Sequence, residues 1–375
     1  MSYALQTLWH ERARYTSGVL AVTFSAVLIA LQCGLLLGLF KITSIPIDNT
    51  TADLWVGSTA VPSVDLGKPI PMSYLSRIAG RSGVQSVELY IANFANFTKP
   101  TGGTELCFLL GSVLDDGAAG AATILTKEQR EALTMPFSVI VDESDVKRLE
   151  LASPDGKPKI NGHEVIVVGT VKGLKSLAAP WMFCSLHTAR QLLGFLLPPD
   201  HVTYLLARCD SPDRAKQVAA ELREQYPDDM IVYTAEEFST GSRLYWLFRT
   251  KAGLAIGYAA LLGLLVGMVI TAQTLYSATA ANAKEFAILL ALGTPRWRIS
   301  LMVLTQSLWV GLIGLALAFP TCLGLRYLAQ QFQTDVDLRW EVLTGTAVLT
   351  ILMALSAGLV ALRSVRQIEP MNLLR

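Results

Sequence analysis

The chain of 375 residues carries 31 basic and 30 acidic side chains, so only 16% of its residues are charged. An ordinary soluble domain has about 25%, and the deficit is confined to four stretches without Asp, Glu, Lys or Arg: residues 17–40, 252–283, 299–325 and 342–362. A bilayer core needs about 20 apolar residues per helix, so each stretch is long enough to span it. The composition therefore excludes a purely soluble protein, and the net charge of +1 argues against a nucleic-acid partner.

The first apolar stretch, residues 17–40, follows a lead that contains Arg12 and Arg14. It is longer than the roughly 7–15 residues of a signal-peptide core, and no small-residue cleavage site follows Phe40. We therefore expect an uncleaved first transmembrane helix, preceded by a cytoplasmic amphipathic segment at residues 1–16.

Residues 41–251 form the long connection between the first and second spans. Alternating or apolar runs bounded by turn residues predict strands at 84–91, 105–110, 137–141, 164–171, 202–207 and 230–233. We expect a folded α+β extracytoplasmic domain. One subdomain comprises about 46–111 and 199–234, and a strand-rich subdomain, about 112–198, is inserted into it.

Two helix starts stand out in this connection. Ser211, Pro212 and Asp213 supply an N-cap, a first helical position and a first-turn acid, and predict a β-α-β unit with the strands on either side. Thr234 and Glu237 form a capping box that starts a stalk helix at about 235–251. We expect this helix to continue unbroken into the second span, with a break at Gly241 as the alternative.

The second span, residues 252–283, carries small residues at helical spacing. At about 100° per residue they form one strip, which allows close approach of another helix from the same chain or from a second copy; chance in a glycine-rich span is the alternative. The predicted helix-packing residues are Gly253, Gly257, Ala260, Gly263 and Gly267.

Residues 284–298 connect the second span to the third, residues 299–325. Gly293 is a natural helix terminator, and Thr294 and Pro295 begin the next helix. This short helix is more apolar than a solvated loop requires, so it either lies in the membrane interface or docks on a cytoplasmic partner. The residues alone leave both open. The site residues in this segment are Lys284, Glu285, Phe286, Leu289, Leu290, Leu292, Gly293, Arg296 and Arg298.

Orientation follows from Lys and Arg in the short segments. Residues 1–16, 284–298 and the tail 363–375 together carry eight, against two in the connection 326–341. By the positive-inside rule we expect a multi-pass protein of the cytoplasmic membrane with both termini in the cytoplasm, 326–341 outside, and 342–362 as the fourth span.

Motifs for catalysis are missing from the sequence, which has no G-x-x-x-x-G-K-S/T loop, no H-E-x-x-H and no G-x-S-x-G. We expect no catalytic residue, no metal site and no cofactor. For Cys107, Cys184 and Cys209, three buried thiols are favoured over one disulfide with a free thiol.

The connection 284–298 resembles the coupling helix of the FtsX-like ABC transporter permeases, the superfamily of MacB, LolC and FtsX. Glu285, Leu292, Gly293, Arg296 and Arg298 match its acidic residue, Leu-Gly step and basic turn. Within that superfamily the chain is most similar to the DevC branch of heterocyst-glycolipid-type exporters, through the segments 3–14, 53–56, 83–87 and 245–246.

The resemblance implies an α-helical membrane protein with four transmembrane helices and a large α+β extracytoplasmic domain, a type VII ABC permease with a porter-like subdomain at 46–111 and 199–234. It implies a permease homodimer and a separate cytoplasmic ATPase that binds ATP and Mg. ATPase motion would pass through the membrane by mechanotransmission, and a lipid, glycolipid or other amphiphile would be exported with a membrane-fusion protein and an outer-membrane channel. The alternatives are a lipoprotein-releasing permease, an FtsX-like activator of a hydrolase, and a membrane sensor or scaffold.

Overall fold

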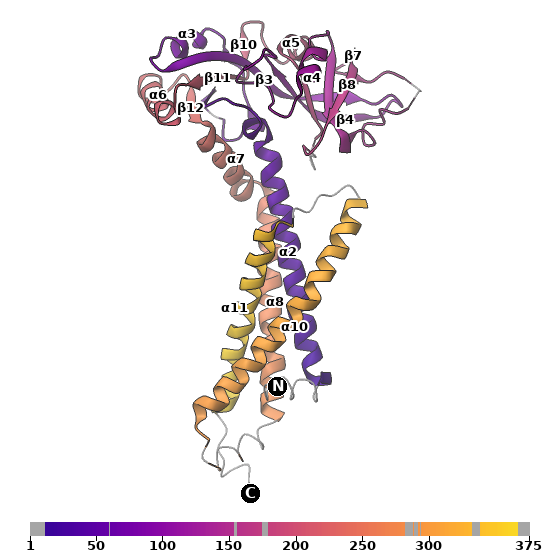
Figure 1. Ribbon diagram of the computed structural model, residues 1–375, viewed down its shortest axis with the longest axis vertical. Coiled ribbons are helices and arrows are strands. Elements are labelled where there is room, and N and C mark those ends of the chain that lie inside the picture. The colour runs from indigo at the N-terminus through magenta and orange to yellow at the C-terminus, as the bar shows by residue number, and fades with distance from the viewer. Residues whose placement is uncertain are drawn as a thin grey trace. The chain divides into compact units, whose positions relative to one another are not determined.

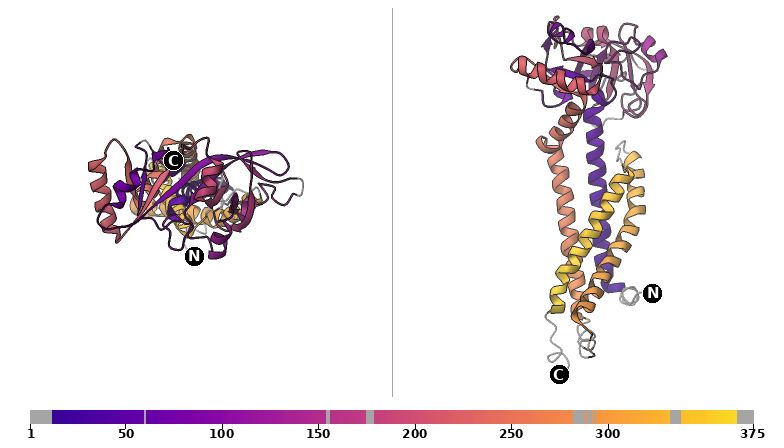
Figure 2. Two further views of the ribbon diagram at one scale, coloured as in Figure 1. Left: turned by 90° about the horizontal axis from the view of Figure 1, so that it is seen from above. Right: turned by 60° about the vertical axis from the view of Figure 1, so that its left-hand side comes forward.

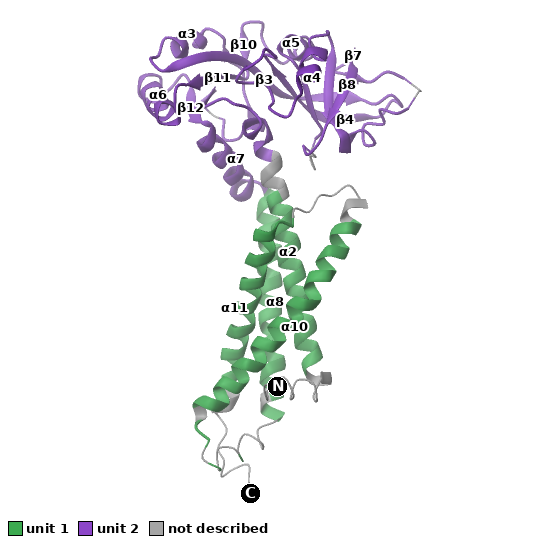
Figure 3. Ribbon diagram, in the orientation of Figure 1, with its two compact units in different colours: residues 1–38, 251–375 green, residues 39–250 purple. Residues whose placement is uncertain are grey.

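The computed structural model describes residues 12–59, 61–153, 156–174, 179–281, 288, 292, 294–331 and 338–366. The chain divides into two compact units, which Figure 3 colours separately. We call residues 1–38 with 251–375 the membrane unit and residues 39–250 the sheet unit.

The membrane unit consists of long helices that lie side by side (Figure 2). They are α2 (Arg12–Asp48), whose last turns belong to the sheet unit, α8 (Lys251–Ala281), α10 (Arg296–Gln331) and α11 (Trp340–Arg366). Each contains a segment long and apolar enough to cross a membrane: Tyr15–Leu37, Gly253–Ala278, Trp297–Leu328 and Trp340–Leu362. The four spans expected from the sequence are confirmed.

The sheet unit is built on one mixed sheet with the strand order β12-β1-β11-β3-β4-β9-β5-β8 (Figure 1). These strands are β1 (Leu54–Gly57), β3 (Val84–Thr98), β4 (Thr104–Ser112), β5 (Ser138–Asp142), β8 (Ile166–Val171), β9 (Trp181–Ser185), β11 (Tyr204–Cys209) and β12 (Ile231–Thr234). β6 (Lys159–Ile160) and β7 (His163–Glu164) branch from β3, while β2 (Ile70–Pro71) pairs with β10 (His201–Val202). Together with the helices, this sheet confirms the large mixed α/β domain.

Strands β4 and β9 join the two parts of the chain that the sequence assigns to separate subdomains, since they pair in parallel with Phe108 opposite Trp181. Strand β3 extends the sheet from β4 to β11. Its first half pairs with β11, with Tyr90 opposite Tyr204, and its second half pairs with β4, with Ile91 opposite Gly111. At about 3.3 Å per residue, its 15 residues span roughly 50 Å, long enough to serve both neighbours. The structure thus places 46–111, 112–198 and 199–234 on a single sheet.

Helices and short 3-10 turns cover the two faces of the sheet. They are η1 (Val64–Leu66), α3 (Tyr74–Ala79), α4 (Lys127–Ala132), η2 (Glu143–Asp145), α5 (Leu186–Leu192), α6 (Pro212–Gln225) and α7 (Ala235–Arg249). Alternation along β1 places Leu54 in one core, with Val218 of α6, and Trp55 in the other, with Phe238 of α7. α6 and α7 therefore pack on opposite faces.

The helix predicted from Ser211 is confirmed as α6, and the Ser211 hydroxyl accepts a hydrogen bond from the Arg214 amide (3.2 Å). The strands that flank it, β11 and β12, are separated by β1, which is antiparallel to both. The strands of the predicted β-α-β unit are therefore not neighbours in the sheet, because β1, from the start of the sheet unit, lies between them.

The unbroken helix expected from Thr234 into the second span is wrong. α7 ends at Arg249, and Thr250 has extended backbone angles (φ −96°, ψ 147°) before α8 begins at Lys251. The Thr250 hydroxyl donates to the Trp246 carbonyl (2.5 Å) and so competes with helical hydrogen bonding at this point. Gly241, the alternative break, lies within α7.

The cysteines are all free, and Cys107, Cys184 and Cys209 are buried. Burial raises the pKa of Cys107 to about 12 and that of Cys209 to about 11. The structure therefore decides for buried thiols and against a disulfide in the sheet unit.

Candidate functional site: the connection before α10, the span packing and the α2–α7 junction

Six residues of the predicted coupling helix lie outside the described residues: Lys284, Glu285, Phe286, Leu289, Leu290 and Gly293. Leu292 lies in a turn, with its side chain 77% exposed. Arg296 is the first residue of α10, directly after Pro295.

The start of α10 also exposes an aromatic side chain that sequence reasoning left out. Trp297 is 63% exposed, and the guanidinium carbon of Arg298 lies 5.5 Å from the centroid of its ring. The sequence places Trp297 between Arg296 and Arg298, and this pattern could have indicated a contact residue, because an indole beside cations suits a membrane interface or a protein partner. Leu292 and Trp297 thus present exposed apolar side chains at this end of α10.

Two of the predicted packing residues on α8 lie against α2. A Cβ atom at Gly263 would lie 2.4 Å from Leu28 Cδ2, and one at Gly267 would lie 2.0 Å from Ser25 Oγ. The Ser25 hydroxyl donates to the Gly263 carbonyl (3.0 Å). These two glycines therefore serve packing within one chain, where no side chain would fit.

The other three residues of the strip differ among themselves. Gly257 is exposed, and a Cβ atom there would meet nothing within 4 Å. Gly253 is buried, whereas Ala260 is half-buried. The second half of the strip, Gly263 and Gly267, therefore packs against α2, whereas Gly257 lies on the exposed surface of the helix bundle.

Close contacts of the same kind join the other spans. A Cβ atom at Gly314 of α10 would lie 2.6 Å from Val22 of α2, and one at Gly358 of α11 would lie 2.5 Å from Ser307 of α10. Without a hydrophobic driving force between helices in lipid, such close packing supplies much of their attraction. The described spans thus form one closely packed bundle.

Within the sheet unit, the end of α2 is bound to α7 through a cluster that we call the α2–α7 junction: Ser44, Asp48, Ser239 and Arg243. Asp48 accepts from the Ser239 hydroxyl (2.8 Å), the Ser44 hydroxyl (2.6 Å) and Arg243 Nη2 (2.6 Å), while Arg243 Nε donates to Ser44 (3.0 Å). Sequence reasoning missed this cluster. The only signal was the shared four-residue step of Ser44–Asp48 and Ser239–Arg243, which places each pair on one helix face.

Further contacts bind the middle of α7 to the sheet unit. Trp246 Nε1 donates to Asp65 (3.1 Å), and the Ser242 hydroxyl accepts from the Val64 amide (3.2 Å). Phe238 is buried, with its ring centroid 5.7 Å from that of Trp55 and 5.1 Å from that of Tyr233.

The start of α7 is fixed by the capping box expected from the sequence. The Thr234 hydroxyl accepts from the Glu237 amide (3.2 Å), and Glu237 accepts from the Thr234 amide (3.0 Å) and from Arg223. Partial burial raises the pKa of Glu237, but the hydrogen bonds from Arg223 and Thr234 outweigh it and hold the pKa below its ordinary value. α7 is therefore fixed along its length and is a rigid part of the sheet unit.

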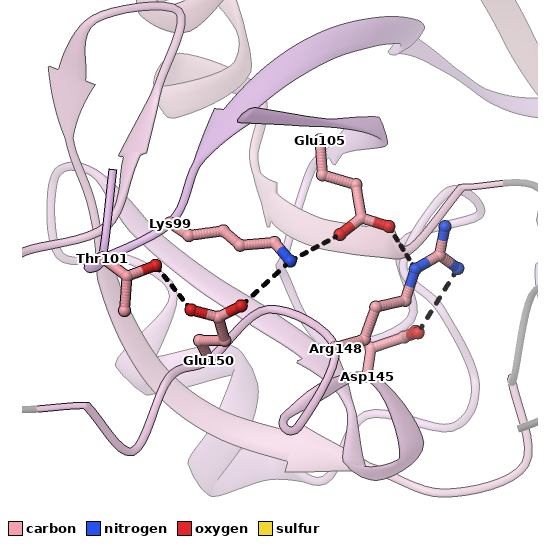
Figure 4. Close-up of polar contacts among 6 residues, drawn as sticks. All are labelled: Lys99, Thr101, Glu105, Asp145, Arg148 and Glu150. Carbon is pink, nitrogen blue, oxygen red and sulfur yellow. Dashed lines mark hydrogen bonds and ion pairs between the residues drawn. The ribbon is translucent and has the colours of Figure 1, made fainter. Parts of the chain in front are cut away.

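A second polar cluster lies between the β3–β4 hairpin and the segment after η2 (Figure 4). Lys99 Nζ lies 3.4 Å from Glu105 and 3.3 Å from Glu150, and Arg148 bonds Glu105 as well. Hydrogen bonds from Thr101 and Lys99 lower the pKa of Glu150. Because the charges are engaged with one another, the cluster is suited to holding the hairpin in place rather than to binding a ligand.

The described part of the chain contains no group of three or more His, Cys, Asp or Glu side chains that could hold a metal ion.

The solved structures that are similar to part of the chain include the following two. The periplasmic region of MacB from Actinobacillus actinomycetemcomitans is 13% identical, with 52% of this chain and 94% of that chain covered and a TM-score of 0.34. The extracellular domain of the noncanonic ABC-type transporter YknZ from Gram-positive bacteria is also 13% identical, with 48% and 98% covered and a TM-score of 0.33.

The last three spans give a family match. No curated protein matches the chain. Residues 257–370, however, match the model of the FtsX-like permease C-terminal family. This region contains α8 from Gly257 onward and the whole of α10 and α11. The last three spans therefore carry the C-terminal domain of the FtsX-like permeases.

Proposed function

We propose that the chain is the permease subunit of an ATP-driven ABC exporter and carries the motion of a separate cytoplasmic ATPase to the sheet unit. The observation that carries the proposal is the FtsX-like permease match over residues 257–370. The rigid attachment of α7 to the sheet supports it, because movement of α7 must move the sheet unit with it.

The finer parts of the proposal come from the resemblance of the sequence to the DevC branch. The permease forms a homodimer in the cytoplasmic membrane with both termini in the cytoplasm, and the sheet unit lies outside. The exported substrate is a lipid, glycolipid or other amphiphile, passed on with a membrane-fusion protein and an outer-membrane channel. ATP and Mg are bound by the ATPase, and the permease hydrolyses nothing itself.

The ATPase contact is tested by Leu289→Asp. If the predicted coupling helix docks through Phe286 and Leu289, which are three residues apart and share a face, a charge at 289 enters an apolar contact without a partner. We expect association with the ATPase to weaken by about 3 kcal/mol, roughly a hundredfold, measured by co-purification from membranes. The purified permease should hydrolyse no ATP until the ATPase is added.

Ile288→Asp is the matched control, since it introduces the same charge one position away, on another helix face, where the side chain is 49% exposed. It should retain the ATPase. Full retention in Leu289→Asp as well, or ATP hydrolysis by the permease alone, would contradict the proposed coupling.

The proposed orientation is tested by labelling intact cells with a membrane-impermeant maleimide. The native thiols should give little background, because four are buried and Cys33 is half-buried within the first span, and both test positions, Leu292 and Lys172, are exposed. Lys172→Cys should be labelled from outside, whereas Leu292→Cys should react only after the membrane is opened. The reverse pattern would invert the topology and remove the cytoplasmic ATPase contact.

A further inference from the structure

The last turns of α10 carry an arginine within a segment that is apolar enough to cross a membrane. Arg326 belongs to the candidate span Trp297–Leu328. Its side chain is half-buried, and its Nε atom is buried without a hydrogen-bond partner. Glu341 is the only carboxylate that the structure describes in the membrane unit, and it is exposed on α11 and forms no ion pair with Arg326. Within the described residues, the guanidinium of Arg326 is therefore unpaired.

An unpaired guanidinium in a spanning helix needs a partner from its surroundings. Arginine keeps its proton in proteins, so it cannot avoid the cost of burial by becoming neutral. A cation in the hydrocarbon of a bilayer is expensive, and long side chains near the end of a span lower this cost by reaching the interface. The partner of Arg326 is therefore a group at the membrane interface.

The exposed aromatic residues of α10 indicate the depth of Arg326. Trp297 is 63% exposed and Tyr327 is 65% exposed, and these two residue types are enriched at membrane interfaces. At about 1.5 Å per residue, the helix between them is roughly 45 Å long, which matches the thickness of a bilayer with its head groups. Arg326 precedes Tyr327 and so lies at the level of the head groups in one leaflet.

We propose that Arg326 binds the phosphate of a bilayer phospholipid through the terminal nitrogens of its guanidinium. The planar fork of arginine matches two phosphate oxygens, and the phosphate is the anionic group found at this depth. The lipid is a resident of the bilayer around α10 and not the exported substrate. The site does not depend on the ATPase contact, so its failure would leave the proposed function standing.

The test measures lipid binding to the full chain by native mass spectrometry in dodecyl maltoside, a detergent without phosphate. Dioleoylphosphatidylglycerol and digalactosyl dioleoylglycerol have the same alkyl chains, and only the first carries a phosphate. The first phospholipid should bind about fivefold more tightly than the galactolipid. Arg326→Gln should remove this difference, whereas Arg326→Lys, which keeps the charge but not the fork, should retain part of it. Equal binding of the two lipids to the wild type would overturn the proposal.

Arg339→Gln is the matched control, since it removes the same charge at the other end of the connection 326–341, where the side chain is exposed. It should keep the preference for the phospholipid. Either variant lowers the number of Lys and Arg residues in that connection from two to one, which strengthens the expected orientation in the membrane. An equal loss in both variants would show that only the net charge matters. Displacement of the lipid by millimolar inorganic phosphate would assign the site to the free anion. Both results would overturn the lipid site.

A carboxylate from the same connection, in this chain or in a second copy, is the competing partner. The sequence supplies Asp335, Asp337 and Glu341. If one of them pairs with Arg326, Arg326→Gln should bind the phospholipid as the wild type does, and replacing all three acids by their amides should increase its binding. That combination would overturn the proposal, whereas a preference that requires Arg326 and persists without the three acids would support it.

Discussion

Replacing Gly267 by leucine is expected to destabilise the bundle of spanning helices. The new Cβ atom would lie 2.0 Å from Ser25 Oγ, 2.6 Å from Ser25 Cβ and 3.0 Å from Met353 Sδ, so α8 must move away from both α2 and α11. Overpacking of this kind costs about 1–3 kcal/mol. The separation of α2 and α8 would also break the hydrogen bond from Ser25 to Gly263.

Gly257→Leu is the matched control, since it makes the same change ten residues earlier on the same helix, where a Cβ atom meets nothing within 4 Å. Both variants gain the same intrinsic helix propensity, about 1 kcal/mol, so their difference reports packing alone. Unfolding of the purified chain in mixed micelles, followed by circular dichroism, should show Gly267→Leu less stable than Gly257→Leu by about 2 kcal/mol. Equal stability would mean that α2 and α8 do not pack through this strip.

Replacing Phe238 by alanine is expected to loosen α7 from the sheet. The ring is 2% exposed and contacts Trp55, Tyr204 and Tyr233, with centroids 5.7, 5.7 and 5.1 Å away. Removal of a buried phenyl group leaves a cavity and costs about 3–5 kcal/mol. If α7 carries motion to the sheet unit, this variant should also lose transport while it keeps the ATPase.

Hydrogen exchange in the full chain measures the effect locally. Amides of β1 should exchange about two orders of magnitude faster in Phe238→Ala, because 3 kcal/mol corresponds to roughly a hundredfold change in the opening equilibrium. Phe248→Ala removes the same ring from the same helix at a position that is 63% exposed, and its exchange should match the wild type. Unchanged protection of β1 in Phe238→Ala would show that α7 is not fixed to the sheet through this ring.

The features that the sequence by itself determined are the local ones. Four charge-free stretches were enough to predict four spans, since length and composition decide whether a helix can cross a bilayer. The capping box of Thr234 and Glu237 and the N-cap Ser211 are present as predicted, because a cap involves residues only three positions apart. The coupling-helix assignment stays a prediction from sequence, since most of its residues lie outside the described part of the chain.

Only the tertiary structure decided which residues meet across long separations. The small-residue strip on α8 looked uniform in sequence, yet Gly267 packs on Ser25 while Gly257 faces outward. The α2–α7 junction joins Asp48 to Arg243, which is 195 positions away. Strand β1, near the start of the sheet unit, lies between β11 and β12, which are near its end. Helix caps and spans depend on residues close together in the sequence. The long-range contacts depend instead on which side chains of different elements pack closely against one another in the folded chain.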